Sequence, residues 1–118
     1  MVAVGYTSKG ERLEFNCSDN LYCNNRDLVS LEIPIGVKCV YCSNNKLTKL
    51  KLPEGVIKVD CWNNQLTKLI IPDGVEEVYC HNNKLTELIV PESVTRLYCD
   101  KEVSGLEEFI GEIKIELW

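Results

Sequence analysis

Apolar residues recur along the middle of the chain at a fixed step of 19 residues. In each copy three aliphatic positions precede a proline, and two valine-rich positions follow it. The columns are Leu28, Leu47, Leu66 and Leu85; Leu31, Leu50, Leu69 and Leu88; Ile33, Leu52, Ile71 and Val90; Val37, Val56, Val75 and Val94; and Val40, Val59, Val78 and Leu97. Self-similarity at a short fixed period indicates stacked units that bury one continuous core together.

A cysteine follows the last of these valine-rich positions two residues later, and the shared unit is LTxLxLPxGVxxVxCxNNx. The cysteine column consists of Cys23, Cys42, Cys61, Cys80 and Cys99. A period of 19 residues is too short for a pair of helices but suits one short strand and an extended return per turn. The pattern therefore predicts a mainly β solenoid.

Alternation within the unit predicts which side chains enter the core. In Val59–Cys61 the two outer residues point inward and Asp60 points outward, because successive strand residues face opposite sides. In Leu50–Leu52 the same rule exposes Lys51 and predicts a second, extended wall. The following Pro-x-Gly ends that segment, since proline lacks an amide donor and glycine accepts a positive φ.

Read from Val56 to Leu66, the unit "VIKVDCWNNQL" resembles the leucine-rich repeat signature LxxLxLxxNxL, with Cys61 in the third leucine position. The resemblance covers roughly residues 18–103. The short unit looks most like the bacterial and viral classes, including the recognition arms of secreted effectors. The resemblance implies a parallel concave sheet, short convex segments and a protein partner. It also implies a buried asparagine ladder at Asn45, Asn64 and Asn83, whose amides satisfy backbone groups of neighbouring turns. The preceding Asn44, Asn63 and Asn82 suit the tight turn, because asparagine tolerates left-handed backbone.

The whole chain, 1–118, is predicted to form one domain with about five turns. We expect an N-terminal cap at 1–20, repeats at 21–103 and a C-terminal cap at 104–118. Alternating apolar residues predict a β-hairpin in the first cap and a strand in the second: Val2, Val4 and Tyr6 with Leu13, Phe15 and Cys17, and then Ile113, Ile115 and Leu117. The repeat degenerates at both ends, where Arg26 and Glu102 replace the ladder asparagine and Ser104 replaces a leucine.

The composition of the chain limits the classes of partner and the compartment that we expect. The chain has 18 acidic and 13 basic residues and a net charge of −5, which disfavours nucleic acid and anionic membranes as partners. No apolar run suits a signal peptide or a membrane span. Seven cysteines are an odd number and are typical of free thiols in a reducing compartment. We expect a cytoplasmic protein, and secretion as an effector stays open.

The positions of the cysteines predict thiols that pack in the core and take no part in catalysis. A small buried thiol is a good hydrophobe, and Cys80 and its neighbour His81 should point to opposite sides of the strand, so they form no dyad. Cys39 and Cys42 match CxxC but should also diverge. With one histidine in the chain, we expect no catalytic residue, metal or cofactor. Cys39, near Lys38 and Lys58, and Cys17 are the thiols whose reactivity the sequence leaves open.

The outward strand positions form the candidate binding surface. Tyrosine occupies four of five places in one column, and tyrosine is favoured in protein interfaces. The column is Tyr22, Tyr41, Asp60, Tyr79 and Tyr98; the flanking column is Asn20, Cys39, Lys58, Glu77 and Arg96; and Trp62 and His81 lie just beyond. We expect a protein partner on this surface. The alternatives are a column that only stabilises the sheet by stacking, a carbohydrate ligand, a weakly self-associating scaffold, and, least favoured, a thiol enzyme.

Overall fold

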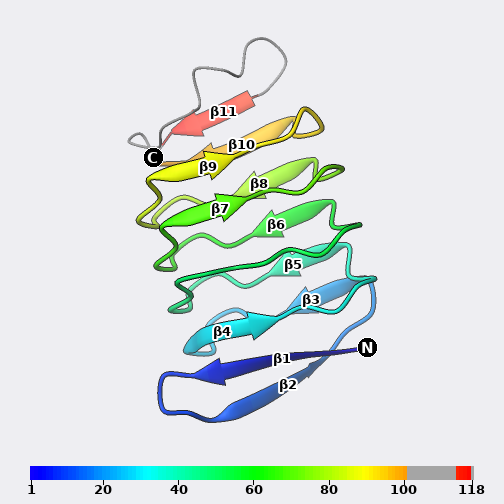
Figure 1. Cartoon of the computed structure of the whole chain (residues 1–118), viewed down its shortest axis with the longest axis vertical. Helices are drawn as coiled ribbons and strands as arrows, with labels where there is room; N and C mark the ends of the chain where they lie inside the picture. Colours follow the sequence, from blue (N-terminus) through cyan, green and yellow to red (C-terminus); the bar gives the residue numbers. More distant parts are fainter. Residues whose placement is uncertain (101–113, 118) are drawn as a thin grey trace.

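The computed structural model describes residues 1–100 and the backbone of residues 114–117. The described residues contain strands and turns and no helix, so no helix among them could cross a membrane. The chain coils into a stacked β-solenoid (Figure 1). Its strands are β1 (Val2–Thr7), β2 (Arg12–Asn16), β3 (Asn20–Tyr22), β4 (Leu28–Glu32), β5 (Cys39–Tyr41), β6 (Lys58–Asp60), β7 (Lys68–Ile70), β8 (Glu77–Tyr79), β9 (Glu87–Ile89), β10 (Arg96–Cys99) and β11 (Lys114–Leu117).

One wall of the solenoid is a six-stranded parallel sheet in the order β11-β10-β8-β6-β5-β3. Each strand of the repeat pairs with the strand one repeat later, so Val40 lies opposite Val59 and Val59 opposite Val78. The register follows from the period, because equal chain lengths return equal positions to the same level. Strands β3 to β10 enclose four complete turns, where about five were predicted, and the end of the predicted repeats, 101–103, lies outside the described residues.

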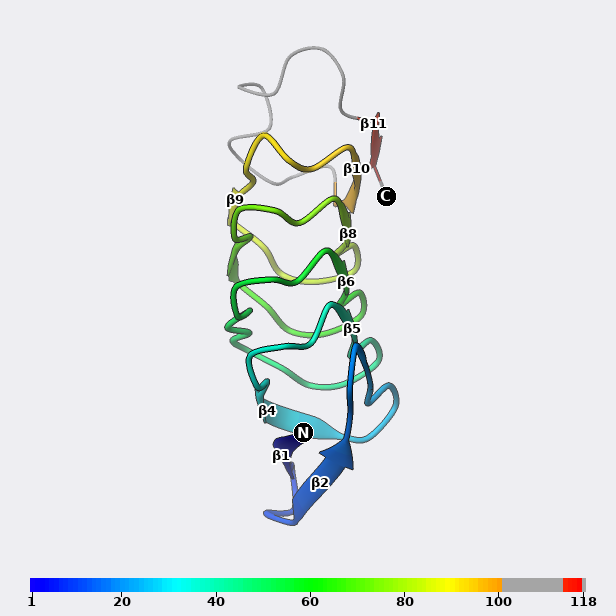
Figure 2. The same cartoon turned by 90° about the vertical axis from the view of Figure 1, so that its right-hand side faces the viewer.

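The opposite wall is less regular. Strands β7 and β9 pair in parallel, and Leu69 lies opposite Leu88. In the preceding turn Leu50 and Leu52 are buried and Lys51 is exposed, which confirms the predicted extended segment. Figure 2 shows the two walls side by side in a nearly straight column.

The core between the walls consists of the predicted columns. All their aliphatic residues are buried except Ile33, which is partly buried, and all five column cysteines are at most 1% exposed. The burial of Cys42, Cys61, Cys80 and Cys99 confirms the inward orientation predicted for them. Burying a leucine or valine side chain stabilises a fold by ~1.5–3 kcal/mol. The stacked columns are therefore the main source of stability.

The ladder asparagines link neighbouring turns. Asn64 donates its amide N–H groups to the carbonyls of Cys42, one turn earlier, and Cys61, in its own turn, at 3.0 and 3.1 Å. Its Oδ1 accepts from the Leu47 amide at 3.0 Å. Asn45 and Asn83 make the equivalent bonds. These contacts satisfy buried backbone N–H and C=O groups that the short strands do not pair.

The outer asparagines take the left-handed backbone expected of them. Asn44, Asn63 and Asn82 have φ of 55°, 56° and 56°. Their side chains also form a second ladder at the surface, because Asn82 donates to Asn63 and Asn63 donates to Asn44. Gly55 and Gly74, at the opposite turns, have φ of 94° and 93°, as the Pro-x-Gly pattern predicts.

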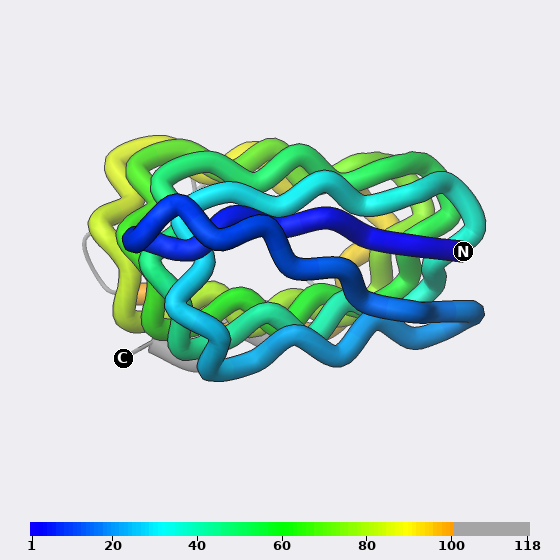
Figure 3. The backbone as a smooth tube through the Cα atoms, turned by 90° about the horizontal axis from the view of Figure 1, so that it is seen from below, coloured from blue at the N-terminus to red at the C-terminus, as the bar shows by residue number. Residues whose placement is uncertain are grey.

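The predicted N-terminal hairpin closes one end of the solenoid. Strands β1 and β2 pair antiparallel, and β1 also pairs antiparallel with β4. Seen from below, the hairpin crosses the opening between the walls (Figure 3). The side of β1 that faces the core carries Ala3, Gly5 and Thr7. The larger apolar residues of this strand, Val2, Val4 and Tyr6, lie on its other side. The close approach explains this, since a Cβ on Gly5 would lie 2.7 Å from Leu28 Cδ2.

Strand β11 confirms the predicted C-terminal strand, because it pairs in parallel with β10 and places Lys114 opposite Arg96. The expectations for Glu102, Ser104 and Ile113 lie outside the described residues.

Candidate interaction face

The outward column predicted from the repeat lies in register across the parallel sheet. Tyr22 pairs with Tyr41, Tyr41 with Asp60, Asp60 with Tyr79, and Tyr79 with Tyr98. The residues between the two outward columns, such as Val40 and Val59, are fully buried, so the column faces away from the core. We define the tyrosine face as this column together with Lys58, Trp62, Glu77, His81 and Arg96.

The tyrosine rings stack in two pairs. The centroids of Tyr22 and Tyr41 lie 5.0 Å apart with the planes at 4°, and those of Tyr79 and Tyr98 lie 4.8 Å apart at 22°. This spacing matches the ~4.8 Å between neighbouring strands, so the sheet itself sets the stacking distance. The four tyrosines therefore form two ordered, stacked pairs on one surface.

Between these two stacked pairs the tyrosine column is interrupted. Asp60 stands at the level of the missing ring, and the Lys58 ammonium occupies the space above it. Lys58 Nζ lies 5.4 Å from the Tyr41 centroid and 5.5 Å from the Tyr79 centroid, within the range of cation–π attraction. Burial lowers the pKa of Lys58, but Tyr41, Glu77, Tyr79 and Asp60 outweigh burial and raise that pKa above its usual value. The ammonium is therefore held in its charged form.

Trp62 and His81 form a third stacked pair at one border of the face. Their centroids lie 5.4 Å apart with the planes at 5°, and His81 also contacts the Tyr98 ring at 6.4 Å. Partial burial lowers the pKa of His81, which favours the neutral ring at neutral pH. His81 packs on the surface while Cys80 is fully buried, so the two neighbours do diverge as predicted.

Charged residues form the other border. Glu77 accepts a hydrogen bond from the Tyr79 hydroxyl at 3.2 Å, and Arg96 Nη1 lies 3.8 Å from the same carboxylate. A hollow of about 380 Å³ opens here beside Cys39, Ile57 and Lys58. The border thus offers both charge signs and a half-buried thiol.

The column cysteines are chemically quiet. Burial raises the pKa of Cys23 to about 12 and that of Cys99 to about 11. Burial raises the pKa of Cys42, Cys61 and Cys80 well above the usual value. All seven cysteines are free, and only Cys17 and Cys39 are partly exposed. Among residues 1–100 and the backbone of 114–117, no group of three or more histidine, cysteine or acidic side chains is arranged to hold a metal.

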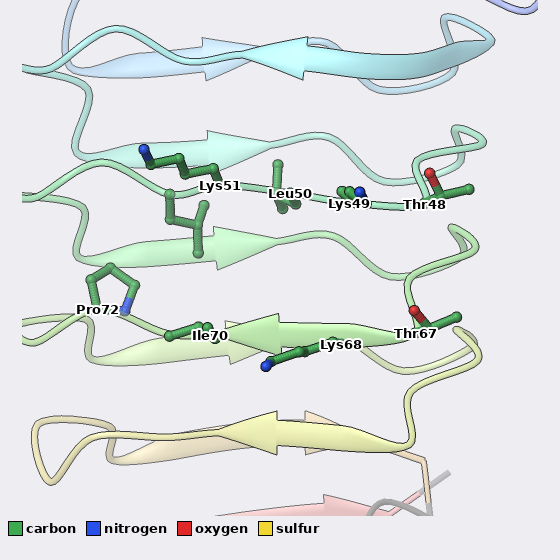
Figure 4. A pocket seen from close by; sticks show the side chains of 9 residues that line it. Thr48, Lys49, Leu50, Lys51, Thr67, Lys68, Ile70 and Pro72 are labelled. Atoms are coloured by element: carbon green, nitrogen blue, oxygen red, sulfur yellow. The ribbon is translucent and has the colours of Figure 1, made fainter.

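The opposite wall carries a groove that sequence reasoning missed. It has a volume of about 660 Å³ and lies where the segment 49–52 runs beside β7 (Figure 4). Its lining includes Leu50 and Ile70 and the lysines at 49, 51 and 68. Lys68 is paired with Glu87 at 3.5 Å. The only signal in the sequence is the lysine-rich "LTKLKLP" copy.

Comparisons of the chain with protein-family models, with curated proteins and with solved structures found no match.

Proposed function

We propose that this chain is a non-catalytic interaction module that binds a protein partner on the tyrosine face. The observation that carries the proposal is the pre-ordered aromatic surface, in which Tyr22 and Tyr41, Tyr79 and Tyr98, and Trp62 and His81 stack in pairs. Binding costs conformational entropy when side chains must be fixed, and rings that are already stacked lose less. The mixed charges of Lys58, Glu77 and Arg96 would form a polar rim.

The repeat pattern supports the same proposal. The unit resembles the leucine-rich repeat signature, and proteins of that family most commonly bind other proteins. A solenoid of short parallel strands with an asparagine ladder agrees with that resemblance. The free thiols at Cys17 and Cys39 agree with the reducing compartment inferred for the chain.

The size of the face limits what it binds alone. Five strands spaced ~4.8 Å apart extend about 24 Å. A strip of that length offers roughly 400 Å², about half of the ~800 Å² per partner of a standard interface. The proposed module would therefore use its borders as well, bind weakly, or serve as the recognition part of a larger protein.

The test replaces Tyr41, Tyr79 and Tyr98 together by serine. A control replaces Ile70 and Ile89, which are 53% and 46% exposed on the opposite wall, by serine. Partners captured from native lysate are identified by mass spectrometry, and their affinity for each purified variant is measured by calorimetry. We expect the tyrosine variant to lose at least about tenfold in affinity and the control to retain it. Equal affinity of the tyrosine variant would show that the face is not the site.

A self-associating or purely structural scaffold is the second candidate. The purely structural role is favoured because the tyrosine rings already stack on one another within the sheet. In that case cross-strand stacking stabilises the turns, and the tyrosine variant would lose stability without losing a partner.

A further inference from the structure

One position on the tyrosine face departs from the repeat. Asp60 stands where the other four strands of the repeats, β3, β5, β8 and β10, carry tyrosine. Its neighbours Tyr41 and Tyr79 are two strands apart, roughly 10 Å, so the column contains a slot one ring wide with a carboxylate at its base. Aspartate is disfavoured in strands. A residue that contradicts the pattern of every other copy is typical of a functional position.

The slot already accepts a positive charge. Lys58 Nζ is nearly equidistant from the Tyr41 and Tyr79 centroids, at 5.4 and 5.5 Å. Both rings therefore present the faces that attract a cation. Because Lys58 reaches the slot with a flexible side chain from the neighbouring column, a better-fitting cation can replace it.

Lys58 leaves the carboxylate incompletely satisfied. Asp60 Oδ1 is buried and finds no hydrogen-bond donor among the described residues. An unpaired buried polar atom costs free energy, and burial raises the pKa of Asp60 accordingly. No N–H donor from residues 1–100 is therefore directed at the base of the slot, although its walls already hold a charge.

We propose that the slot between Tyr41 and Tyr79 binds a guanidinium group, supplied by an arginine side chain of the partner, with Asp60 accepting its N–H donors. This inference rests on the proposed function and names the chemistry of the partner. A guanidinium is planar, stacks on aromatic faces and carries five donors, whereas an ammonium is a compact point charge. At about one strand spacing from each ring, the planar group would take the place of the missing tyrosine.

The experiment uses the full chain and a small probe, Nα-acetyl-arginine N-methylamide. Binding is followed by NMR through the ring signals of Tyr41 and Tyr79. We expect saturable binding that becomes about three- to fivefold tighter in Lys58→Met, because the competing ammonium is gone. The lysine analogue of the probe should bind at least about fivefold more weakly, since it cannot stack as a plane.

Two substitutions at the base of the slot complete the test. Asp60→Asn keeps the shape but removes the charge, and should weaken the probe by about tenfold. Asp60→Tyr restores the residue found in the other strands, so it should fold and should abolish binding by filling the slot. Ile89→Ser, on the opposite wall and away from the tyrosine face, is the control and should bind as the natural chain does.

The inference is overturned if Lys58→Met shows no saturable binding, if Asp60→Tyr binds the probe, or if the lysine analogue binds equally well. These outcomes leave the proposed function intact, because partner capture by the tyrosine face is measured separately. Conversely, a tyrosine variant that captures the partner normally would overturn the proposed function whatever the probe does.

Discussion

At the scale of single residues, the same side-chain types have opposite properties in different columns. Cys42, Cys61 and Cys80 lie in the dry interior, where burial disfavours the thiolate and raises its pKa. Cys17 and Cys39 are partly exposed. Reactivity therefore depends on the column that a cysteine occupies and not on its neighbours in the sequence.

Thiol accessibility follows directly from this arrangement. Alkylation of the native chain with iodoacetamide at neutral pH should modify at most Cys17 and Cys39, whereas all seven cysteines should react after denaturation. Intact-mass spectrometry gives the count, and peptide mapping identifies the sites. Modification of five or more thiols in the native chain would contradict the burial of the cysteine column.

The charge of Asp60 predicts a dependence on pH. Burial raises the pKa of Asp60 in the folded chain above the ordinary 3.8, so folding favours the protonated carboxyl. Stability is therefore lost as pH rises from 3.8 through the folded pKa, and the full loss is present at pH 7. Asp60→Asn should be more stable than the natural chain at pH 7, and this advantage should disappear at pH 3.

Urea unfolding followed by the fluorescence of Trp62 and Trp118 measures the difference at both pH values. Comparing the two chains at the same pH cancels the effects of the other carboxylates. An advantage of equal size at pH 3 and pH 7 would show that the charge of Asp60 is not its cause.

At the scale of elements, the strands are only three to five residues long in the repeats. Backbone pairing therefore supplies few hydrogen bonds between turns, and the side-chain ladders supply more. Asn64 bonds to three carbonyls and one amide of two successive turns. Its replacement by alanine leaves these buried groups unpaired, so we expect a loss of about 1–3 kcal/mol in the free energy of unfolding.

Gln65, which is exposed beside Asn64, offers the control. Gln65→Ala should change the free energy of unfolding by no more than about 0.5 kcal/mol. Both variants are measured by urea denaturation, and similar losses in both would contradict the role assigned to the ladder.

The N-terminal hairpin depends on a close contact between β1 and β4. A side chain on Gly5 would meet Leu28 Cδ2 and the Ser30 carbonyl. Gly5→Val should therefore destabilise the chain by about 1–3 kcal/mol through overpacking. Val2→Ala, on the exposed side of the same strand, should have little effect. Thermal unfolding followed by circular dichroism compares the two, and an unchanged midpoint for Gly5→Val would exclude the tight contact.

At the scale of the whole molecule, stacked turns contact only their neighbours, while the two long faces stay available. The described chain measures 42 × 26 × 16 Å, so the faces are large relative to the ends. A net charge of −5 opposes association of identical copies. The size of the tyrosine face alone is small for a stable dimer.

We accordingly expect a monomer of 13.4 kDa at low micromolar concentration. Static light scattering over a hundredfold concentration range gives the mass. A mass that rises with concentration in the natural chain, and stays constant when Tyr41, Tyr79 and Tyr98 are replaced by serine, would favour the self-associating scaffold instead.

The repeat in the sequence determined the solenoid, its core columns, its parallel register and the outward place of the tyrosines. Identical 19-residue steps return the same chemistry to the same level, so the relation between turns follows without knowledge of any contact. The asparagine turns and the Pro-x-Gly turns were predictable for the same reason, because their backbone angles depend on local residue type.

The tertiary structure decided what depends on the distance between particular atoms. Only the folded chain places the Lys58 ammonium between two rings and turns Ala3, Gly5 and Thr7 toward the core. It also leaves Asp60 Oδ1 without a donor from the part of the chain that the structure describes. The groove beside β7 likewise depends on how segment 49–52 and β7 lie next to each other. A period specifies which residues are neighbours, but side-chain conformation and the closeness of packing specify how they meet.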